Sequence, residues 1–140
     1  MPRASRKLIN KDLNDELNEN FLILISSLRV SQEINYFFAG FLTKEEKKMI
    51  PKRLMLHLML FNNIPDSKIS AHLGMSYETI RTHKNNLDSL SNEYKEILAK
   101  ISRRESIRNL FKKIDKKMER LDSFLKAKSN MKARAKVYGE

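Results

Sequence analysis

The sequence predicts an all-α protein, and three observations support this prediction. Apolar residues recur three and four positions apart over most of the chain, which is the spacing of helices that bury one side. Only three glycines and three prolines occur in 140 residues, whereas a fold of many short strands and turns needs more of both. No stretch sustains the alternation of apolar and polar residues that is typical of a strand.

The composition fits a folded domain with a modest core, since 41% of the residues are apolar and 32% are charged. The absence of cysteine excludes disulfides, thiolate catalysis and cysteine-based zinc sites, and fits a reducing compartment. The longest apolar runs, 21–25 and 54–61, are too short to span a bilayer. The first residues also lack the apolar core of a signal peptide. We therefore expect a cytoplasmic protein with no membrane contact.

The net charge of +11 is unevenly distributed. Residues 100–140 hold 14 Lys and Arg against 5 Asp and Glu, while residues 1–99 hold 14 against 12. A basic excess gathered at one end of a chain favours a polyanionic partner, most often a nucleic acid. The alternative is a solvated basic surface that only aids solubility.

Residues 1–10 are expected to form a basic arm, and a first helix is expected from about residue 11 to 28. A second helix is predicted to be capped by Ser31 and to end at Gly40. The apolar sides of these two helices hold Leu13, Leu17, Phe21, Leu24 and Leu28, and Ile34, Phe37 and Phe38.

A third helix should open at Thr43, because Thr43 and Glu46 have the spacing of a capping box. Pro51 lies inside this helix, where it should cause a kink or mark a second start. Residues 62–65 read as a turn. The apolar stripe of the third helix is predicted to hold Ile50, Leu54, Leu58 and Phe61.

The most informative segment is 66–87, which has the spacing of a helix-turn-helix. Asp66 is the predicted N-cap of a short helix with Ile69 and Leu73 on one side, and Gly74 supplies a turn with positive φ. After it, Met75 packs inward, Ser76 caps the next helix, and Ile80 and Leu87 bury that helix against the first. A second helix held in this way can enter the major groove of DNA.

With Ile80 and Leu87 inward, the polar residues of this second helix face outward and are the kinds of group that bind base edges and phosphates. Arg81 could contact guanine with both arms of its guanidinium, and Asn85 could contact adenine. The alternative is an ordinary helical hairpin with a polar outer side. The predicted DNA-binding residues are Ser76, Tyr77, Glu78, Arg81, Thr82, Lys84 and Asn85.

The stretch from Leu42 to Leu87 resembles the Trp repressor family, and most closely its shorter members with Lys/Gln-Arg-Leu in the third helix. Here that tripeptide is Lys52-Arg53-Leu54, and the helix-turn-helix reads Ile69-Ser-Ala-His-Leu-Gly-Met-Ser-Tyr-Glu-Thr-Ile80. The segment 76–83 is also similar to the recognition helix of LuxR-type proteins. Spacing separates the two families, because Gly74 stands 32 positions after Leu42, close to the Trp repressor pattern and several more than the LuxR pattern allows.

The resemblance implies a homodimer with intertwined N-terminal helices, in which each protomer places one recognition helix in the major groove. It also implies an effector site, because the family holds its amino-acid corepressor with two arginines. The first falls on Arg53, which is present. The second falls on Thr82, which cannot clamp a carboxylate as a guanidinium can, so tryptophan is not expected as the ligand.

The C-terminal third departs from the family. Residues 92–101 can supply the family's last helix, with Tyr94, Ile97, Leu98 and Ile101 inward. An additional helix over 103–128 is predicted, followed by a flexible basic tail over 129–140. This helix either packs on its own domain or pairs with a second copy. Its apolar residues follow a heptad pattern at Ile107, Phe111, Ile114, Met118, Leu121 and Leu125.

The opposite side of the additional helix carries four cations at four-residue spacing: Arg108, Lys112, Lys116 and Arg120. Neighbouring like charges destabilise a helix slightly, so this row is easier to understand as a set of phosphate contacts than as a solvated surface, which is the alternative.

No pattern typical of an enzyme is present: there is no glycine-rich phosphate loop, nucleophile elbow or pair of acid and base carboxylates. The histidines at 57, 72 and 83 lack the spacing of metal ligands. We therefore expect no catalytic site, metal or cofactor. The sequence predicts a transcriptional regulator that binds double-stranded DNA as a homodimer through residues 66–87, within a domain of residues 11–102. The alternative is a helical interaction module that binds RNA or a protein assembly through its basic C-terminal helix.

Overall fold

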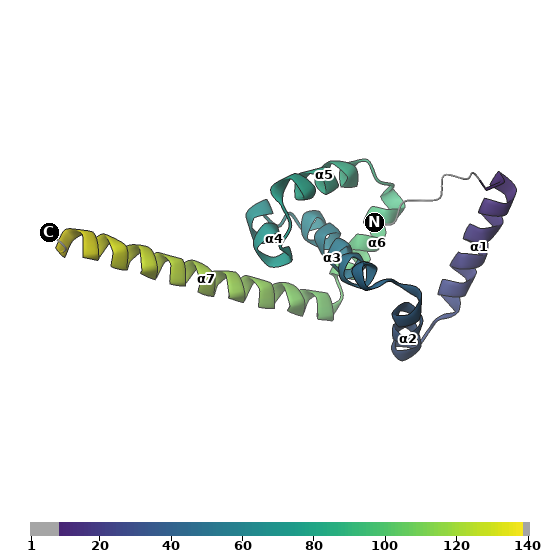
Figure 1. The fold of residues 1–140 in the computed structure, drawn as a ribbon, viewed down its shortest axis with the longest axis horizontal. Helices are drawn as coiled ribbons and strands as arrows, with labels where there is room; N and C mark the ends of the chain where they lie inside the picture. Colours follow the sequence, from purple (N-terminus) through teal and green to yellow (C-terminus); the bar gives the residue numbers. More distant parts are fainter. Residues whose placement is uncertain (1–8, 139–140) are drawn as a thin grey trace. The chain divides into compact units, whose positions relative to one another are not determined.

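The computed structural model describes the backbone of residues 9–138. It also describes their side chains, except those of residues 118, 121, 122, 125 and 133–138. All regular structure in this range is α-helical, which confirms the predicted fold class (Figure 1). In chain order the helices are α1 (Lys11–Ser27), α2 (Ser31–Phe41), α3 (Lys44–Phe61), α4 (Asp66–Leu73), α5 (Tyr77–Asp88), α6 (Asn92–Ser102) and α7 (Glu105–Tyr138).

The capping box at the start of α3 is confirmed. The backbone N–H of Thr43 donates to a carboxylate oxygen of Glu46 over 2.8 Å, and the N–H of Glu46 donates to the Thr43 hydroxyl over 3.2 Å. The two side chains thus satisfy donors that the first turn of a helix leaves without partners. Helix α3 then runs through Pro51 as one element, with no second start.

Two predicted helix starts and one predicted end are wrong by a residue. The N-cap of α2 is Val30, so Ser31 is the first helical residue, and α2 continues past Gly40 to Phe41. The N-cap of α4 is Pro65 rather than Asp66. Within the described chain the side chain of Asp66 makes no capping hydrogen bond, and its carboxylate lies 3.7 Å from the ammonium of Lys84 on α5.

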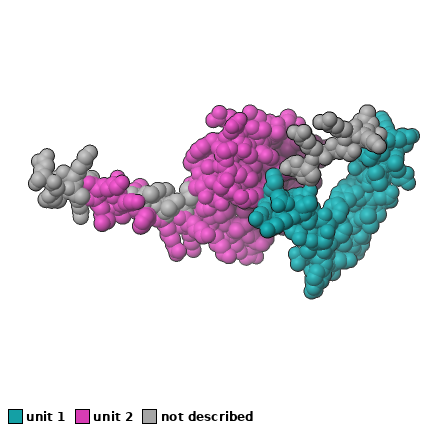
Figure 2. All heavy atoms as spheres, in the orientation of Figure 1, with its two compact units in different colours: residues 1–51 teal, residues 52–140 magenta. Residues whose placement is uncertain are grey.

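The chain divides into two compact units, residues 1–51 and residues 52–140 (Figure 2). In unit 1 no residue of α1 or α2 is buried. Phe37 and Phe41 stack with ring centroids 5.1 Å apart, and Phe21 lies 6.1 Å from Phe41. The leucines of α1 nevertheless stay open, for example Leu17 with half of its surface exposed (51%). The described part of unit 1 therefore has apolar sides but no buried core.

Unit 2 contains the core of the described chain, built around the C-terminal half of α3. Helices α4, α5 and α6 each add buried residues to it. Its buried members are Leu56, Leu58, Met59, Leu60, Ile69, Ile80, Leu87 and Leu98. This packing confirms the predicted inward positions of Ile69, Ile80 and Leu87.

The predicted apolar stripe of α3 is only partly right. Leu58 is buried, but Ile50 and Leu54 are exposed, and Leu56, Met59 and Leu60 are buried in their place. The end of α3 is surrounded by several helices, so residues on more than one of its sides are covered. On α6, Leu98 is buried and Ile97 is exposed, contrary to the prediction that both point inward.

The first turns of α7 pack on the core through Ile107, Phe111 and Ile114, which fits the first of the two alternatives for this stripe, packing on its own domain. The other heptad residues, Met118, Leu121 and Leu125, lie outside the described side chains. The helix continues to Tyr138, so the predicted change to a tail at residue 129 is wrong. Residues 129–138 contain no glycine or proline and are rich in Ala, Lys, Arg and Met, which favour helix.

Two glycine substitutions should change stability in opposite directions. Gly74 has φ 62°, which is strained for any residue with a Cβ, so Gly74→Ala should lower the free energy of unfolding by about 1–2 kcal/mol. Gly40 lies inside α2 with no atom within 4 Å of an added Cβ, so Gly40→Ala should raise it by about 0.5–1 kcal/mol. Urea denaturation of both variants measures this. If both variants changed the free energy of unfolding in the same direction and by the same amount, the left-handed conformation of Gly74 would not be required.

Candidate nucleic-acid interface

The turn between α4 and α5 is fixed by local hydrogen bonds. Gly74 adopts the left-handed conformation, and its N–H donates to the carbonyl of Ser70 over 3.0 Å. The Ser70 hydroxyl donates to the carbonyl of Met75 over 2.8 Å. Ser76 then caps α5 by accepting from the N–H of Thr79 over 3.2 Å, as predicted. Helix α4, this turn and α5 therefore form the helix-turn-helix that the sequence predicts.

Two apolar residues, about two helical turns apart, hold α5 against the core of unit 2. Ile80 is fully buried and Leu87 is 7% exposed, and α5 lies alongside α4 (Figure 1). Because the two residues are seven positions apart, they lie on one side of the helix and turn the other side toward solvent. The outward side is therefore set by core packing.

All seven predicted contact residues of α5 and its cap are exposed. Some of their polar groups are already engaged within the chain: the Thr82 hydroxyl donates to the carbonyl of Glu78 over 2.9 Å, and Lys84 pairs with Asp66. Within the described part of the chain, the side chains of Tyr77, Arg81 and Asn85 make no hydrogen bond or ion pair. These three have their full hydrogen-bonding capacity available for a ligand.

Behind α5 lies a polar junction that the sequence analysis missed. His57 of α3 meets His83 of α5, with Nε2 and Nδ1 3.4 Å apart, and its Nδ1 lies 2.5 Å from the hydroxyl of Tyr94 on α6. Three helices thus meet through one imidazole. Burial holds the pKa of His57 below its usual value of 6.5, and the nearby charges of His83 and Arg53 lower it further. Burial also raises the pKa of Tyr94.

The two positions of the predicted effector site lie on different helices of unit 2. Arg53 is half-buried on α3, one turn before His57, and is close enough to lower the pKa of that histidine. Thr82 is exposed on α5, with its hydroxyl bound to its own helix. Only one cationic side chain therefore occupies the pair of positions at which the resemblance places two.

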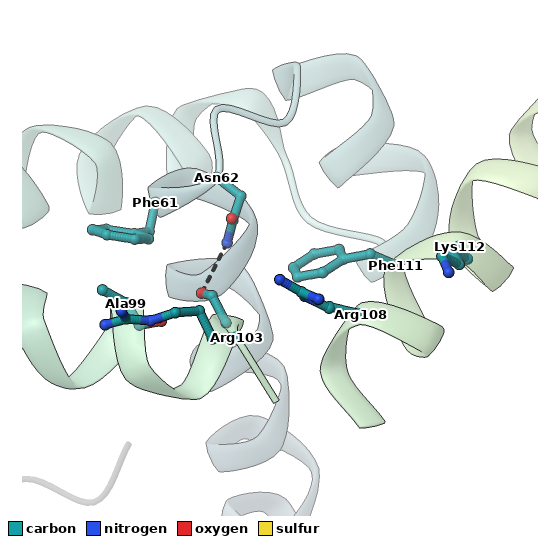
Figure 3. Close-up of a pocket in the computed structure, with 8 residues that line it drawn as sticks. Phe61, Asn62, Ala99, Arg103, Arg108, Phe111 and Lys112 are labelled. Carbon is teal, nitrogen blue, oxygen red and sulfur yellow. Dashed lines mark hydrogen bonds between the residues drawn. The ribbon is translucent and has the colours of Figure 1, made fainter. Parts of the chain in front are cut away.

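The predicted basic row on α7, formed by Arg108, Lys112, Lys116 and Arg120, is exposed along its whole length. Its first two members also line a groove of about 790 Å³ between the end of α3, α6 and α7 (Figure 3). Asn62 donates to the Ser102 hydroxyl over 3.0 Å at its base. The lining contains three cations and no acidic residue: Phe61, Asn62, Ala99, Ser102, Arg103, Arg108, Phe111 and Lys112.

Among the described residues no group of three or more histidine and acidic side chains is arranged to hold a metal. A search of the same residues for helices that could cross a membrane found none.

The sequence signals for the missed features were weak. His83 and Tyr94 stand 26 and 37 positions after His57, so no local motif connects the three residues. The groove is lined by residues from three helices, and in the sequence only the cations of α7 show a regular spacing.

Comparison with known protein families gave a match over most of the helices described above. A family model described as Trp repressor protein matches residues 16–102, which is more than half of the chain. The match runs from α1 to the end of α6 and includes the helix-turn-helix, whereas α7 lies beyond it. A search of curated proteins and a search of solved structures each gave no match.

The junction at His57 predicts a pH-dependent stability. Between the lowered pKa of His57 in the folded chain and its ordinary value of 6.5, the unfolded chain binds a proton that the folded chain does not. The free energy of unfolding should therefore fall as the pH drops below about 6.5, and His57→Gln should reduce this fall. Urea titrations at neutral and mildly acidic pH measure it. An identical acid response in parent and variant would show that His57 is not responsible.

Proposed function

The chain belongs to the Trp repressor family, whose members are DNA-binding helix-turn-helix regulators rather than enzymes, and on this premise we propose that it is a transcriptional repressor that binds double-stranded DNA as a homodimer. One observation carries the proposal: α5 is fixed to the core through Ile80 and Leu87 and turns an exposed polar side to solvent. A helix held in this way is suited to the major groove.

On α5 the proposed roles follow from the chemistry of each side chain. Arg81 can bind guanine through two parallel hydrogen bonds, and Asn85 can pair with adenine. Tyr77 and Lys84 are suited to phosphates, as is the hydroxyl of Ser76 at the N-terminus of the helix. Glu78 and Thr82 complete the exposed side and can accept from or donate to base edges.

The homodimer accounts for the open apolar sides of unit 1. Leu13, Leu17 and Leu24 are each at least half exposed in the single chain, and α1 and α2 have no buried residue. Patches of this kind mark surfaces that are covered by a partner. A second copy is the simplest partner, because a two-fold axis lets each α1 cover the other and places two copies of α5 on one duplex.

We further propose that the protein acts in the cytoplasm, and that any effector differs from tryptophan. Arg53 is the retained member of the family's effector pair, and Thr82 offers no charge for a carboxylate. The junction of His57 with His83 lies beside Arg53 and behind α5, where a bound molecule would affect the position of the recognition helix.

Selection of bound sequences from a pool of random duplexes tests the proposal as a whole. The purified full chain should recover a motif with two-fold symmetry and half-sites about one helical turn apart. Recovery of no motif would refute sequence-specific binding. A motif without symmetry would refute the dimer on DNA.

Arg81→Ala should weaken binding to the selected site by about 1–3 kcal/mol and relax the preference for one base. Arg81→Lys is the matched control, because it keeps the charge and removes the planar fork. We expect the Arg81→Lys variant to keep the parental affinity for random duplexes and to lose the base preference. If both variants lost affinity equally on specific and random DNA, Arg81 would contact only the backbone.

The protein should be dimeric without DNA, because α1 and α2 leave the apolar side of α1 exposed among the described residues of unit 1. Light scattering at micromolar concentration should give about twice the chain mass of 16.5 kDa. Leu17→Asp should lower this mass toward the monomer. A mass near 16.5 kDa for the parent would contradict the dimer.

Free tryptophan should leave the DNA affinity unchanged, since a ligand shifts an equilibrium only if it binds one state more tightly than the other. Titration calorimetry and DNA binding with added tryptophan measure this. Tight binding, or a gain in affinity for DNA, would show that Arg53 holds the carboxylate with another partner. Thr82→Arg provides the comparison that restores the second cation.

A further inference from the structure

Helix α7 carries a basic surface that lies beyond the family match and is separate from the exposed side of α5. We propose that the row Arg108, Lys112, Lys116 and Arg120 binds the backbone of a second DNA duplex, so that a protein bound through α5 holds two duplex segments together. The inference rests on the proposed function, because α5 supplies the first duplex.

The positions of α5 and α7 within unit 2 support two separate surfaces. Both helices pack on the same core, α5 through Ile80 and Leu87 and α7 through Ile107 and Phe111. Figure 1 shows them at opposite edges of this unit, with α3 and α4 between them. Because each helix turns its apolar side to the core, their polar sides diverge. The proposal therefore assigns the row to a duplex other than the one on α5.

The row has the properties of a backbone-binding surface. Four residues of helix rise about 6 Å, so the four cations form a line roughly 18 Å long. None of the four forms an ion pair with a described residue, although Asp115 on the same helix pairs with Lys68 of α4 over 3.7 Å. At its start the row joins the groove, where Arg103 adds a further cation and no acidic residue lines the walls.

Charge decides between the candidate partners. Residues 105–138 hold 11 Lys and Arg against 4 Asp and Glu, so the row of a second copy would repel this one. A polyanion gains from the same charges by releasing its counterions. None of the four residues is aromatic, and Phe61 and Phe111, which line the adjoining groove, are half-buried, so neither offers an open ring on which the bases of a single strand could stack. A duplex backbone, which is read by charge alone, fits it best.

A capture experiment tests the proposal with the full chain. A duplex carrying the selected sequence is immobilised and saturated with protein, and a fluorescent duplex of random sequence is added after washing. The parent should retain the second duplex. The row variant Arg108→Gln, Lys112→Gln, Lys116→Gln and Arg120→Gln should stay on the immobilised duplex but capture roughly tenfold less. The dependence of capture on log salt should flatten by about 3–4.

The matched control replaces Lys113, Lys117, Lys128 and Lys132 with Gln, which removes the same charge from the other flank of α7 and should leave capture close to the parental level. Circular dichroism checks that both variants remain helical. Capture by the row variant equal to that of the parent would overturn the proposal. Loss of the row variant from the immobilised duplex would also overturn it, since α5 and α7 would then share one duplex.

Two further outcomes are informative. If an RNA hairpin were captured and duplex DNA were not, the row would bind RNA and the proposed partner would be wrong. If the protein showed no preferred sequence on the immobilised duplex, the proposed function would fail on its own. Direct titration of a random duplex with the parent and the row variant would still measure binding by α7.

Discussion

Ile80 and Leu87 pack against the apolar end of α3, and this packing sets the direction in which the remaining side of α5 points. Two buried aliphatic side chains contribute several kcal/mol, by the usual cost of truncating such residues. That contribution is spread over two turns, so it fixes rotation about the helix axis as well as position. The exposed side with Arg81 and Asn85 therefore needs no loop or ligand to hold it. Gly74 makes this arrangement possible, since its left-handed backbone lets α4 and α5 meet within three residues.

Polar contacts add to the apolar packing between these helices. His57 of α3 contacts His83 of α5 and Tyr94 of α6. Protonation of His57 would place its positive charge beside His83 and Arg53, which is unfavourable. Arg53, the proposed effector contact, lies in the same region. The structure thus places the junction of His57, His83 and Tyr94 on the inner side of α5 and leaves exposed hydrogen-bonding side chains on the outer side. Charge that is not used in either place is concentrated on α7.

Much of the fold could be predicted from the sequence where the determining pattern is local. The capping box of Thr43 and Glu46, the turn at Gly74 and the seven-residue spacing of Ile80 and Leu87 each depend on neighbours within two turns of helix. Prediction was poorer where residues are buried by helices that are distant in the sequence. The buried residues of α3 lie on several sides because α4, α5 and α6 surround it, so no single stripe could reveal them. The junction at His57 joins residues far apart in the chain, and α7 continues to Tyr138 because no glycine or proline interrupts residues 129–138.

In the proposed complex, α5 enters the major groove once per half of a symmetric dimer. Methylation protection at guanine N7 on the selected duplex tests this most directly, because N7 lies in the major groove. We expect two protected blocks centred about 10–10.5 base pairs apart, and loss of protection in both blocks with Arg81→Ala. Protection confined to adenine N3 in the minor groove, or a single block, would contradict it.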